Sequence, residues 1–204
     1  MVNNSKEYWN QVYEKEINSH WSRGDIPRWQ LILSQVGETD KVLEFGCGTG
    51  EFIYWLCKQR PFCYYIGIDI SSVGIEKAKQ MMPNFRWYEG NGLDCINYKE
   101  LGCDIIISQH TYEHLTPEGR IQFMKDAHTI LPQNGKLVLV FPIHDKEWQE
   151  HDQIWEIEDV AKLVREWKKE WNITVIWRPQ TVYKRADGHN DNDYEEALIF
   201  MRKR

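Results

Sequence analysis

The sequence has no uninterrupted apolar run that approaches the ~20 residues a membrane-spanning helix needs. Its first residues, Met1 to Lys6, lack the apolar stretch of a signal peptide. The five cysteines form no Cys-x-x-Cys pair, and none stands at zinc-ligand spacing from a histidine. We therefore expect a cytoplasmic protein with reduced cysteines, no bound metal and no membrane contact.

Positive charge is also scarce. The 25 lysines and arginines are outnumbered by 31 acidic residues, for a net charge of -6. The basic runs Lys168-Lys169 and Arg202-Lys203-Arg204 are too short for a nucleic-acid footprint, so double-stranded nucleic acid is not an expected partner. Hydrophobic residues make up 42% of the 204 residues, enough for a sizeable core. We expect a single domain over residues 1–204.

Apolar residues follow two patterns, short β-branched runs and longer helical stretches, which alternate as in βα units around a mostly parallel sheet. The expected strands are Lys41–Phe45, Tyr64–Asp69, Phe85–Tyr88, Asp104–Ser108 and Lys136–Phe141. Between them the expected helices are Glu51–Gln59, Val73–Met81 and Pro117–Ile130, the last with Thr116 as N-cap and proline at its first position.

The C-terminal part departs from this alternation. After a helix near Glu156–Glu170 come two strand-like runs, Asn172–Trp177 and Ala197–Met201, with no helical pattern between them. Two such consecutive runs predict a hairpin, so at least one strand at this side of the sheet should be antiparallel.

A turn with three alternating glycines, Gly46, Gly48 and Gly50, follows the first expected strand and precedes a helix. Ligands bind at this end of an open α/β sheet, and glycine permits positive φ and close approach of the backbone. The spacing fails the Gly-x-Gly-x-x-Gly/Ala pattern of nicotinamide enzymes, which would require a small residue at Glu51 or Ile53. The Gly-Lys-Ser/Thr ending of a P-loop is also absent, so the turn favours a ligand without phosphates.

Two acids flank this turn. Glu44 lies two residues before Gly46, where a carboxylate can reach a cationic amino group directly or through water. Asp69 ends the second strand, 19 residues after Gly50, where an acid accepts both ribose hydroxyls of a nucleoside. An ordinary tight turn is the alternative. Together the acids and glycines predict a nucleoside with a positively charged amino-acid tail.

With these residues the sequence resembles the class I S-adenosylmethionine-dependent methyltransferases, in particular the broad methyltransferase-11-like group that acts on small molecules. The resemblance runs from about Val42 to Phe141 and rests on five segments in order, which are Glu44-Phe45-Gly46-Cys47-Gly48-Thr49-Gly50, Gly67-Ile68-Asp69, Gly90-Asn91-Gly92, Asp104-Ile105-Ile106-Ile107-Ser108 with Glu113-His114-Leu115, and Leu131-Pro132-Gln133-Asn134-Gly135-Lys136-Leu137. It implies an α/β, Rossmann-like seven-stranded sheet of order 3-2-1-4-5-7-6, with strand 7 antiparallel and helices on both faces.

The resemblance also implies S-adenosylmethionine as cofactor. Asn91 stands where many members carry an aspartate for the adenine amino group, and its side-chain oxygen can still accept that N–H. Asp94, three residues later, is either a second contact or a helix N-cap. The full set expected to bind the cofactor is Glu44, Gly46, Cys47, Gly48, Gly50, Asp69, Ile70, Asn91, Gly92, Leu93 and Gln109.

The acceptor side is less defined by the sequence. His110 follows the strand end that faces the methyl group in this family, and is our candidate base for a hydroxyl or amine acceptor; lining or capping the loop is its alternative role. Residues 1–30 are expected to form a helical lid whose aromatic side chains close the acceptor pocket, with packing against the sheet as the alternative. The candidate substrate contacts are Trp9, Tyr13, Trp21 and His144.

The expected function is therefore methyl transfer to an oxygen or nitrogen nucleophile of a small molecule. Two other functions stay open. One is a non-catalytic module that binds S-adenosylmethionine, which would have an occluded or flat surface above Gln109 and His110. The other is a methyltransferase that acts on protein or tRNA, although Ser108-Gln109-His110-Thr111 replaces the Asn/Asp-Pro-Pro-aromatic signature of base amino methylation.

Overall fold

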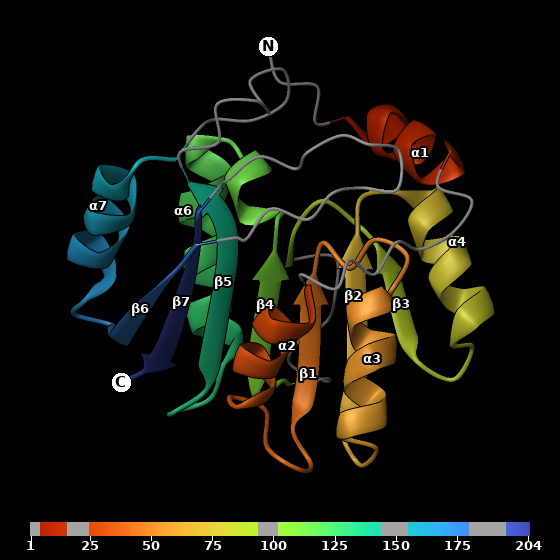
Figure 1. Cartoon of the computed structure of the whole chain (residues 1–204), viewed down its shortest axis with the longest axis horizontal. Helices are drawn as coiled ribbons and strands as arrows, with labels where there is room; N and C mark the ends of the chain where they lie inside the picture. Colours follow the sequence, from red (N-terminus) through yellow and green to blue (C-terminus); the bar gives the residue numbers. More distant parts are fainter. Residues whose placement is uncertain (1–4, 16–24, 94–101, 144–154, 180–194) are drawn as a thin grey trace.

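The computed structural model describes residues 5–15, 25–93, 102–143, 155–179 and 195–204. Within them seven strands form one sheet of order β3-β2-β1-β4-β5-β7-β6, which confirms the expected order (Figure 1). The strands are β1 (Lys41–Phe45), β2 (Tyr64–Asp69), β3 (Arg86–Glu89), β4 (Ile105–Gln109), β5 (Lys136–Ile143), β6 (Trp171–Pro179) and β7 (Glu195–Lys203).

Strand direction divides the sheet into two parts. Strands β1 to β5 pair in parallel, whereas β7 is antiparallel to both β5 and β6, as the hairpin pattern predicts. β1 lies between β2 and β4, and the chain crosses to the other side of β1 between β3 and β4. Such a reversal opens a crevice at the carboxyl ends of the strands, which places the glycine turn after β1 at the ligand-binding edge.

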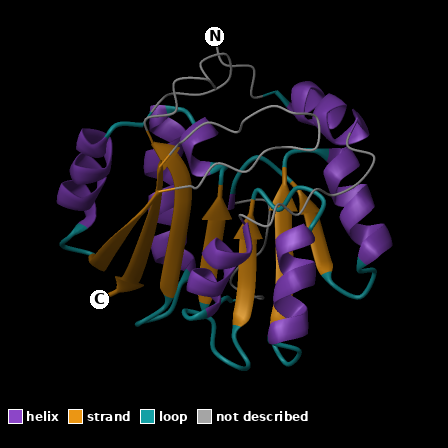
Figure 2. Ribbon diagram, in the orientation of Figure 1, coloured by secondary structure: helices purple, strands orange, loops and turns teal. Residues whose placement is uncertain are grey.

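Helices cover both faces of the sheet (Figure 2). They are α1 (Lys6–Lys15), α2 (Asp25–Leu33), α3 (Glu51–Gln59), α4 (Ser72–Met81), the 3₁₀ turn η2 (Tyr112–His114), α6 (Pro117–Ile130) and α7 (Ile157–Trp167). The N-terminus of α6 is capped as expected, since the Thr116 side chain accepts from the backbone N–H of Gly119. None of the described helices is long and apolar enough to cross a membrane.

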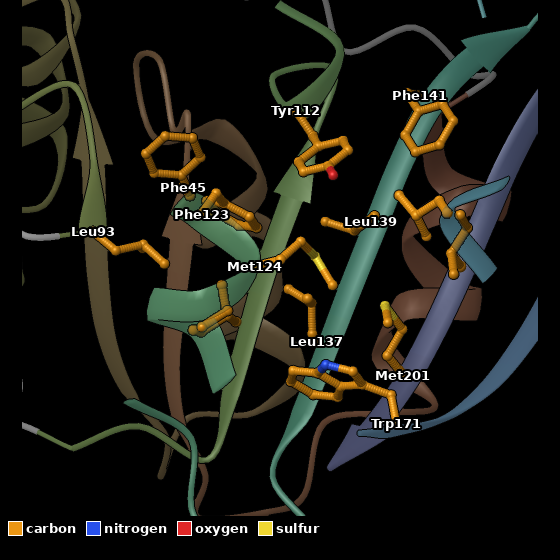
Figure 3. Close-up of a cluster of buried hydrophobic side chains, with 14 of the residues drawn as sticks. Phe45, Leu93, Tyr112, Phe123, Met124, Leu137, Leu139, Phe141, Trp171 and Met201 are labelled. Carbon is orange, nitrogen blue, oxygen red and sulfur yellow. The ribbon is translucent and has the colours of Figure 1, made fainter. Parts of the chain in front are cut away.

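Alternation along the strands produces two hydrophobic cores. Ile106 faces the core that α6 and α7 cover, where Phe123, Met124 and Leu163 pack, and its neighbours Ile105 and Ile107 face the core beneath α2 and α3. Figure 3 shows part of the first core, with Tyr112 and Phe141 toward the carboxyl edge and Trp171 toward the opposite edge. Because both faces of the central strands are buried, they read as continuous apolar runs.

Element boundaries differ from the expected ones most in the C-terminal part, where β6 and β7 extend beyond the expected Asn172–Trp177 and Ala197–Met201 at both ends. β5 continues past Phe141 to Ile143 because the antiparallel partner β7 extends its hydrogen bonding. The helix expected to reach Glu170 ends at Trp167, and Trp171 is instead the buried first residue of β6. Burial of this large ring beneath the sheet outweighs the continuation of helical spacing.

Candidate active site at the carboxyl edge of the sheet

The turn between β1 and α3 adopts the glycine conformation that its sequence predicts. Gly46, Gly48 and Gly50 have φ of 78°, 52° and 82°. The N–H groups of Gly46 and Cys47 donate to the carbonyl of Ile68 at 2.8 and 2.9 Å, which fixes the start of the turn on β2. Because side chains disfavour positive φ, glycine is favoured at all three positions.

Side chains from two other segments occupy the space beside these glycines. A Cβ atom on Gly46 would lie 1.9 Å from Oγ1 of Thr111, and one on Gly48 would lie 2.7 Å from the hydroxyl of Tyr13. The turn is therefore packed between the segment after β4 and helix α1. Any ligand along this turn contacts backbone, with Tyr13 and Thr111 beside it.

Glu44 is buried at the end of β1, with 3% of its surface exposed. Its Oε1 accepts a hydrogen bond from Nε2 of Gln109 at 3.2 Å, whereas Oε2 has no hydrogen-bond partner among the described residues. Burial raises the pKa of Glu44 well above its ordinary value of 4.5, and the charges of Asp69 and Glu51 raise it further. A cationic group favours the ionised form of such a buried carboxyl, because its charge compensates the hydration that the carboxylate lost on burial.

Asp69 ends β2 beside the same turn. Its Oδ2 accepts from the backbone N–H of Gly48 and its Oδ1 from that of Ser71, both at 2.8 Å. Burial raises the pKa of Asp69, in opposition to these two hydrogen bonds. Each carboxylate oxygen has a second lone pair, so both can still accept a ligand hydroxyl while they hold the turn.

The other residues expected at the cofactor lie along the same edge with different exposure. Asn91 is exposed just after β3, and Leu93 is buried in the core. Ile70 follows Asp69 and is half-buried. The buried thiol of Cys47 donates to the carbonyl of Gly48 at 3.9 Å. Asp94, Trp21 and His144 lie outside the described residues.

Helix α1 lies beside α4 at this edge (Figure 1). Asn10 contacts the N-terminus of α4, where its Oδ1 accepts from Oγ of Ser71 at 2.7 Å. Trp9 packs edge-on against the ring of His114, with centroids 5.2 Å apart, and stacks on Tyr13 at 6.1 Å. No residue of α1 is fully buried. The helix thus bridges the β2–α4 loop and the η2 turn through half-buried aromatic rings and polar contacts.

Helix α2 packs differently, although it belongs to the same expected lid segment. Trp29 is buried against Phe52 and Trp55 of α3, with ring centroids 5.5 and 5.4 Å apart. This part of residues 1–30 covers the sheet face. Helix α1, by contrast, places Tyr13 beside Gly48 of the glycine turn.

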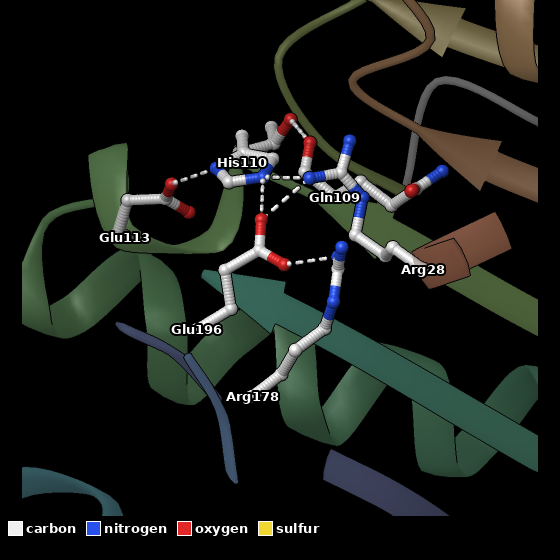
Figure 4. Close-up of polar contacts among 7 residues, drawn as sticks. Arg28, Gln109, His110, Glu113, Arg178 and Glu196 are labelled. Carbon is white, nitrogen blue, oxygen red and sulfur yellow. Dashed lines mark hydrogen bonds and ion pairs between the residues drawn. The ribbon is translucent and has the colours of Figure 1, made fainter. Parts of the chain in front are cut away.

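His110 follows β4 and lies in a cluster of charged side chains that the sequence analysis did not find (Figure 4). Its Nε2 lies 3.1 Å from Oε1 of Glu196, and Nη1 of Arg28 lies 2.5 Å from the same oxygen. Nη1 of Arg178 donates to the other oxygen of Glu196 at 3.1 Å. On the other side of the ring, Nδ1 lies 3.8 Å from Oε1 of Glu113.

Glu196 is fully buried in β7. Although burial opposes its ionisation, the hydrogen bond from His110 and the charges of Arg28 and Arg178 lower its pKa to about 2. A sequence signal for this residue existed: Glu196 directly precedes the apolar run Ala197–Met201 and, two residues before Leu198, belongs to a buried face of the strand. Its partners had no such signal, because α2 and β6 meet it only in the fold.

The part of the chain that the structure describes contains no evident set of metal ligands. No three histidine, cysteine or acidic side chains there lie together in a way that could hold a metal ion.

Comparisons with known proteins agree with this geometry. A family model described as a methyltransferase domain matches residues 42–135. An uncharacterized methyltransferase from Oceanobacillus iheyensis is 30% identical over 154 residues, which cover 72% of this chain and 70% of that protein.

Solved structures of the same kind share the fold. A SAM-dependent methyltransferase from Anabaena variabilis has a TM-score of 0.72 at 17% identity, over 98% of this chain and 93% of the other. The magnesium protoporphyrin IX methyltransferase of Synechocystis PCC 6803, solved with bound SAM, has a TM-score of 0.66 at 12% identity, over 98% and 95% of the two chains.

Proposed function

The chain belongs to the class I S-adenosylmethionine-dependent methyltransferases, and we propose that it methylates an oxygen or nitrogen atom of a small-molecule acceptor. S-adenosylmethionine is its methyl donor. The observation that carries the proposal is the buried Glu44, whose Oε2 has no hydrogen-bond partner among the described residues, beside a turn of three glycines at positive φ.

The described residues fit the donor. Glu44 would hold its ammonium group, since a buried carboxylate without a full set of partners favours a cation. Asp69 would accept the ribose hydroxyls while it keeps its bonds to Gly48 and Ser71. Asn91 would accept the adenine amino group, and the turn itself, with Cys47, Ile70, Gly92, Leu93 and Gln109, would line the remaining surface.

When bound, the donor supplies an electrophilic methyl group on a sulfonium. The protein's contribution is to orient the acceptor in line with that methyl and to exclude water, which can supply most of the rate enhancement. His110, at the end of β4, would remove the proton of a hydroxyl or amine acceptor.

A small acceptor is supported by what surrounds this edge. Helix α1 lies over the glycine turn, with Trp9 and Tyr13 reaching toward the turn and the segment after β4. The chain has net negative charge, which disfavours a polyanionic acceptor such as tRNA. One structural neighbour is named for the small molecule magnesium protoporphyrin IX.

Calorimetry with S-adenosylhomocysteine tests donor binding. We expect micromolar affinity, about -7 to -8 kcal/mol, and no comparable binding of NAD. A preference for NAD would refute the proposal. Incubation with labelled S-adenosylmethionine then separates the acceptor classes: label in small metabolites supports the proposal, whereas label in bulk tRNA or protein favours a macromolecular acceptor. Donor binding without any transfer would indicate a non-catalytic module.

The same titrations should show proton release at Glu44. Burial raises the pKa of this carboxyl, so its proton is retained to a higher pH in the free protein, whereas the ammonium group binds the carboxylate form. Affinity should therefore rise as the pH increases through the raised pKa of Glu44, as long as the ligand's amino group stays cationic. Heats measured in buffers of different ionisation enthalpy would reveal the released proton. Glu44→Gln should abolish the release and weaken binding by about 1.5–3 kcal/mol.

Stability has the opposite pH dependence at this residue. The pKa of Glu44 is higher in the folded than in the unfolded protein, so its contribution to stability is greatest below the unfolded pKa and is lost as pH rises through the folded value. Bound S-adenosylhomocysteine should reduce this loss. Equal pH dependence of the melting temperature with and without the ligand would contradict an ammonium contact at Glu44.

We further propose that α1 is a lid over the donor. Its contacts are polar or half-buried, as in the ion pair of Lys6 with Glu89 and the hydrogen bond from Lys77 to the carbonyl of Tyr13. Deletion of residues 1–22 should leave the protein folded and weaken S-adenosylhomocysteine binding about tenfold, because Tyr13 no longer covers the turn.

Two results would separate the lid from a packing role. Loss of the cooperative melting transition would favour packing, and unchanged affinity would eliminate the lid. Tyr13→Ala is the matched point variant, since it removes the ring beside Gly48 and leaves the docking contacts of Asn10 in place. It should reproduce most of the affinity loss.

A further inference from the structure

His110 is held by groups that the cofactor-binding turn does not use. We propose that Glu196, clamped by Arg28 and Arg178, is a positioning residue that keeps Nε2 of His110 protonated and makes Nδ1 the basic nitrogen. The inference rests on the proposed methyl transfer and narrows the acceptor to a group that gives up a proton, a hydroxyl or an amine.

Four elements converge to build this arrangement. Arg28 comes from α2, His110 from the end of β4, Arg178 from β6 and Glu196 from β7 (Figure 4). Glu196 has no exposed surface and the Arg28 side chain is 7% exposed, whereas 32% of the His110 side chain is exposed. The carboxylate of Glu196 is thus held within the protein interior. The imidazole of His110 is the more exposed group, which a molecule at the sheet edge can reach.

Three distances decide which ring nitrogen carries the proton. Nη1 of Arg28, Nε2 of His110 and Oε1 of Glu196 lie within 2.5 to 3.1 Å of one another. If Nε2 were unprotonated, it could accept from Nη1 of Arg28 at 2.9 Å, but its lone pair would also face the charged carboxylate oxygen at 3.1 Å, which is repulsive. If Nε2 is protonated, it and Arg28 both donate to Oε1, and a carboxylate oxygen accepts two such bonds readily. The second arrangement removes the repulsion between the lone pair and the carboxylate and keeps the bond from Arg28 to Glu196, although the two donor nitrogens then lie 2.9 Å apart.

The ionisation state of Glu196 supports the same assignment. Arg178 contacts its second oxygen at 3.1 Å, so two guanidinium groups keep the carboxylate charged. A charged carboxylate accepts and cannot donate. In neutral His110 the lone pair therefore belongs to Nδ1, as the partner carboxylate of a catalytic histidine sets the tautomer in other enzymes.

The backbone at His110 is also held in an uncommon conformation. Its φ is 49°, in the left-handed region that only a few per cent of residues other than glycine adopt, histidine more often than most. The N–H of His110 donates to the carbonyl of Val140 at 2.8 Å, which keeps the residue on β5 while the chain turns away. Such conformations cost on the order of 1 kcal/mol and persist where the surroundings impose them.

The groups around Nδ1 suit a proton acceptor. Oε1 of Glu113 lies 3.8 Å away, beyond hydrogen-bond distance, and Nη2 of Arg120 donates to the carbonyl of Glu113. As the acceptor atom bonds to the methyl carbon and the methyl–sulfur bond breaks, the acceptor's proton moves to Nδ1. The sulfonium charge is thereby replaced by an imidazolium that lies between Glu113 and Glu196, with Arg28 beside its Nε2 and Arg178 on the second oxygen of Glu196.

Nitrogen NMR of the full chain, labelled with ¹⁵N-histidine and saturated with S-adenosylhomocysteine, tests the assignment. The His110 signals are identified by their loss in His110→Gln. At a pH where the ring is neutral, we expect Nε2 to carry the proton. Glu196→Gln should shift the signals toward a mixture of both tautomers, and Glu113→Gln, the matched control, should leave the tautomer unchanged.

A wild-type ring protonated at Nδ1 would overturn the inference. So would a folded Glu196→Gln variant with wild-type signals, because an ion-pair cluster that only ties α2 to β7 predicts no tautomer control. If that variant does not fold, a wild-type ring protonated at Nδ1 would still overturn the inference. Tight S-adenosylhomocysteine binding together with an Nδ1-protonated ring would leave the methyl-transfer proposal intact and remove only this assignment.

Discussion

Replacement of Asp69 by alanine should weaken S-adenosylhomocysteine binding by about 2–4 kcal/mol, since two charge-assisted hydrogen bonds to the ribose would be lost. The structure adds a second expected effect. Asp69 also accepts from the N–H groups of Gly48 and Ser71, so the variant leaves two buried donors without their partner. The free energy of unfolding should fall as well, by about 1–3 kcal/mol. Calorimetry and urea unfolding measure the two losses separately.

A matched control stands at the opposite edge of the sheet. Oδ2 of Asp40 accepts from the N–H of Gly37 at 2.8 Å, in the same kind of carboxylate-to-turn contact. Asp40→Ala should lower stability and leave affinity unchanged. Should Asp69→Ala fail to fold, Asp69→Asn keeps the shape and one carbonyl oxygen and should still bind less tightly. A folded Asp69 variant with wild-type affinity would show that this carboxylate does not hold the ribose.

Gly46→Ala is the second variant with a large expected effect. At φ of 78° an alanine is strained by about 1–2 kcal/mol, and its Cβ would lie 1.9 Å from Oγ1 of Thr111. That hydroxyl donates to the carbonyl of Gln109, and the short Thr111 side chain has no flexible end that can move aside. Overpacking adds about 1–3 kcal/mol. We expect stability to fall by about 2–5 kcal/mol in total, measured from the midpoint of urea unfolding.

Gly102→Ala separates strain from crowding. Gly102 has φ of 50°, and a Cβ there would meet nothing within 4 Å. Only the strain of about 1–2 kcal/mol should remain, with no change in S-adenosylhomocysteine affinity. Gly46→Ala should in addition weaken that affinity, because the glycine turn must shift. Equal stability losses in the two variants would mean that Thr111 does not crowd Gly46.

Much of the fold could be predicted because its determinants are local. Strands β1 and β2 and helix α3 have the expected bounds, since each is a short run with one hydrophobic pattern, ended by glycine or another turn residue. The order of the sheet followed from a resemblance carried by segments between about Val42 and Phe141, and the antiparallel β7 from the lack of a helix between two strand-like runs. The sequence predicts the C-terminal end of helix α7 less well, because burial of Trp171 in β6 overrides the helical spacing of the apolar residues.

The donor side and the acceptor side of the candidate site also differ in how far the sequence predicts them. Glu44, the three glycines and Asp69 lie within 26 positions of one another, on two adjacent strands and one turn, so their spacing alone predicted a nucleoside with a cationic tail. The partners of His110 had no comparable signal. Arg28 and Glu196 are 168 positions apart in the sequence. They meet only because α2 covers the face of the sheet to which the inward-facing side chains of β7 belong. The hydrophobic periodicity of the sequence indicates that such strand positions are buried. Which charges compensate one another there is decided by packing of the whole chain.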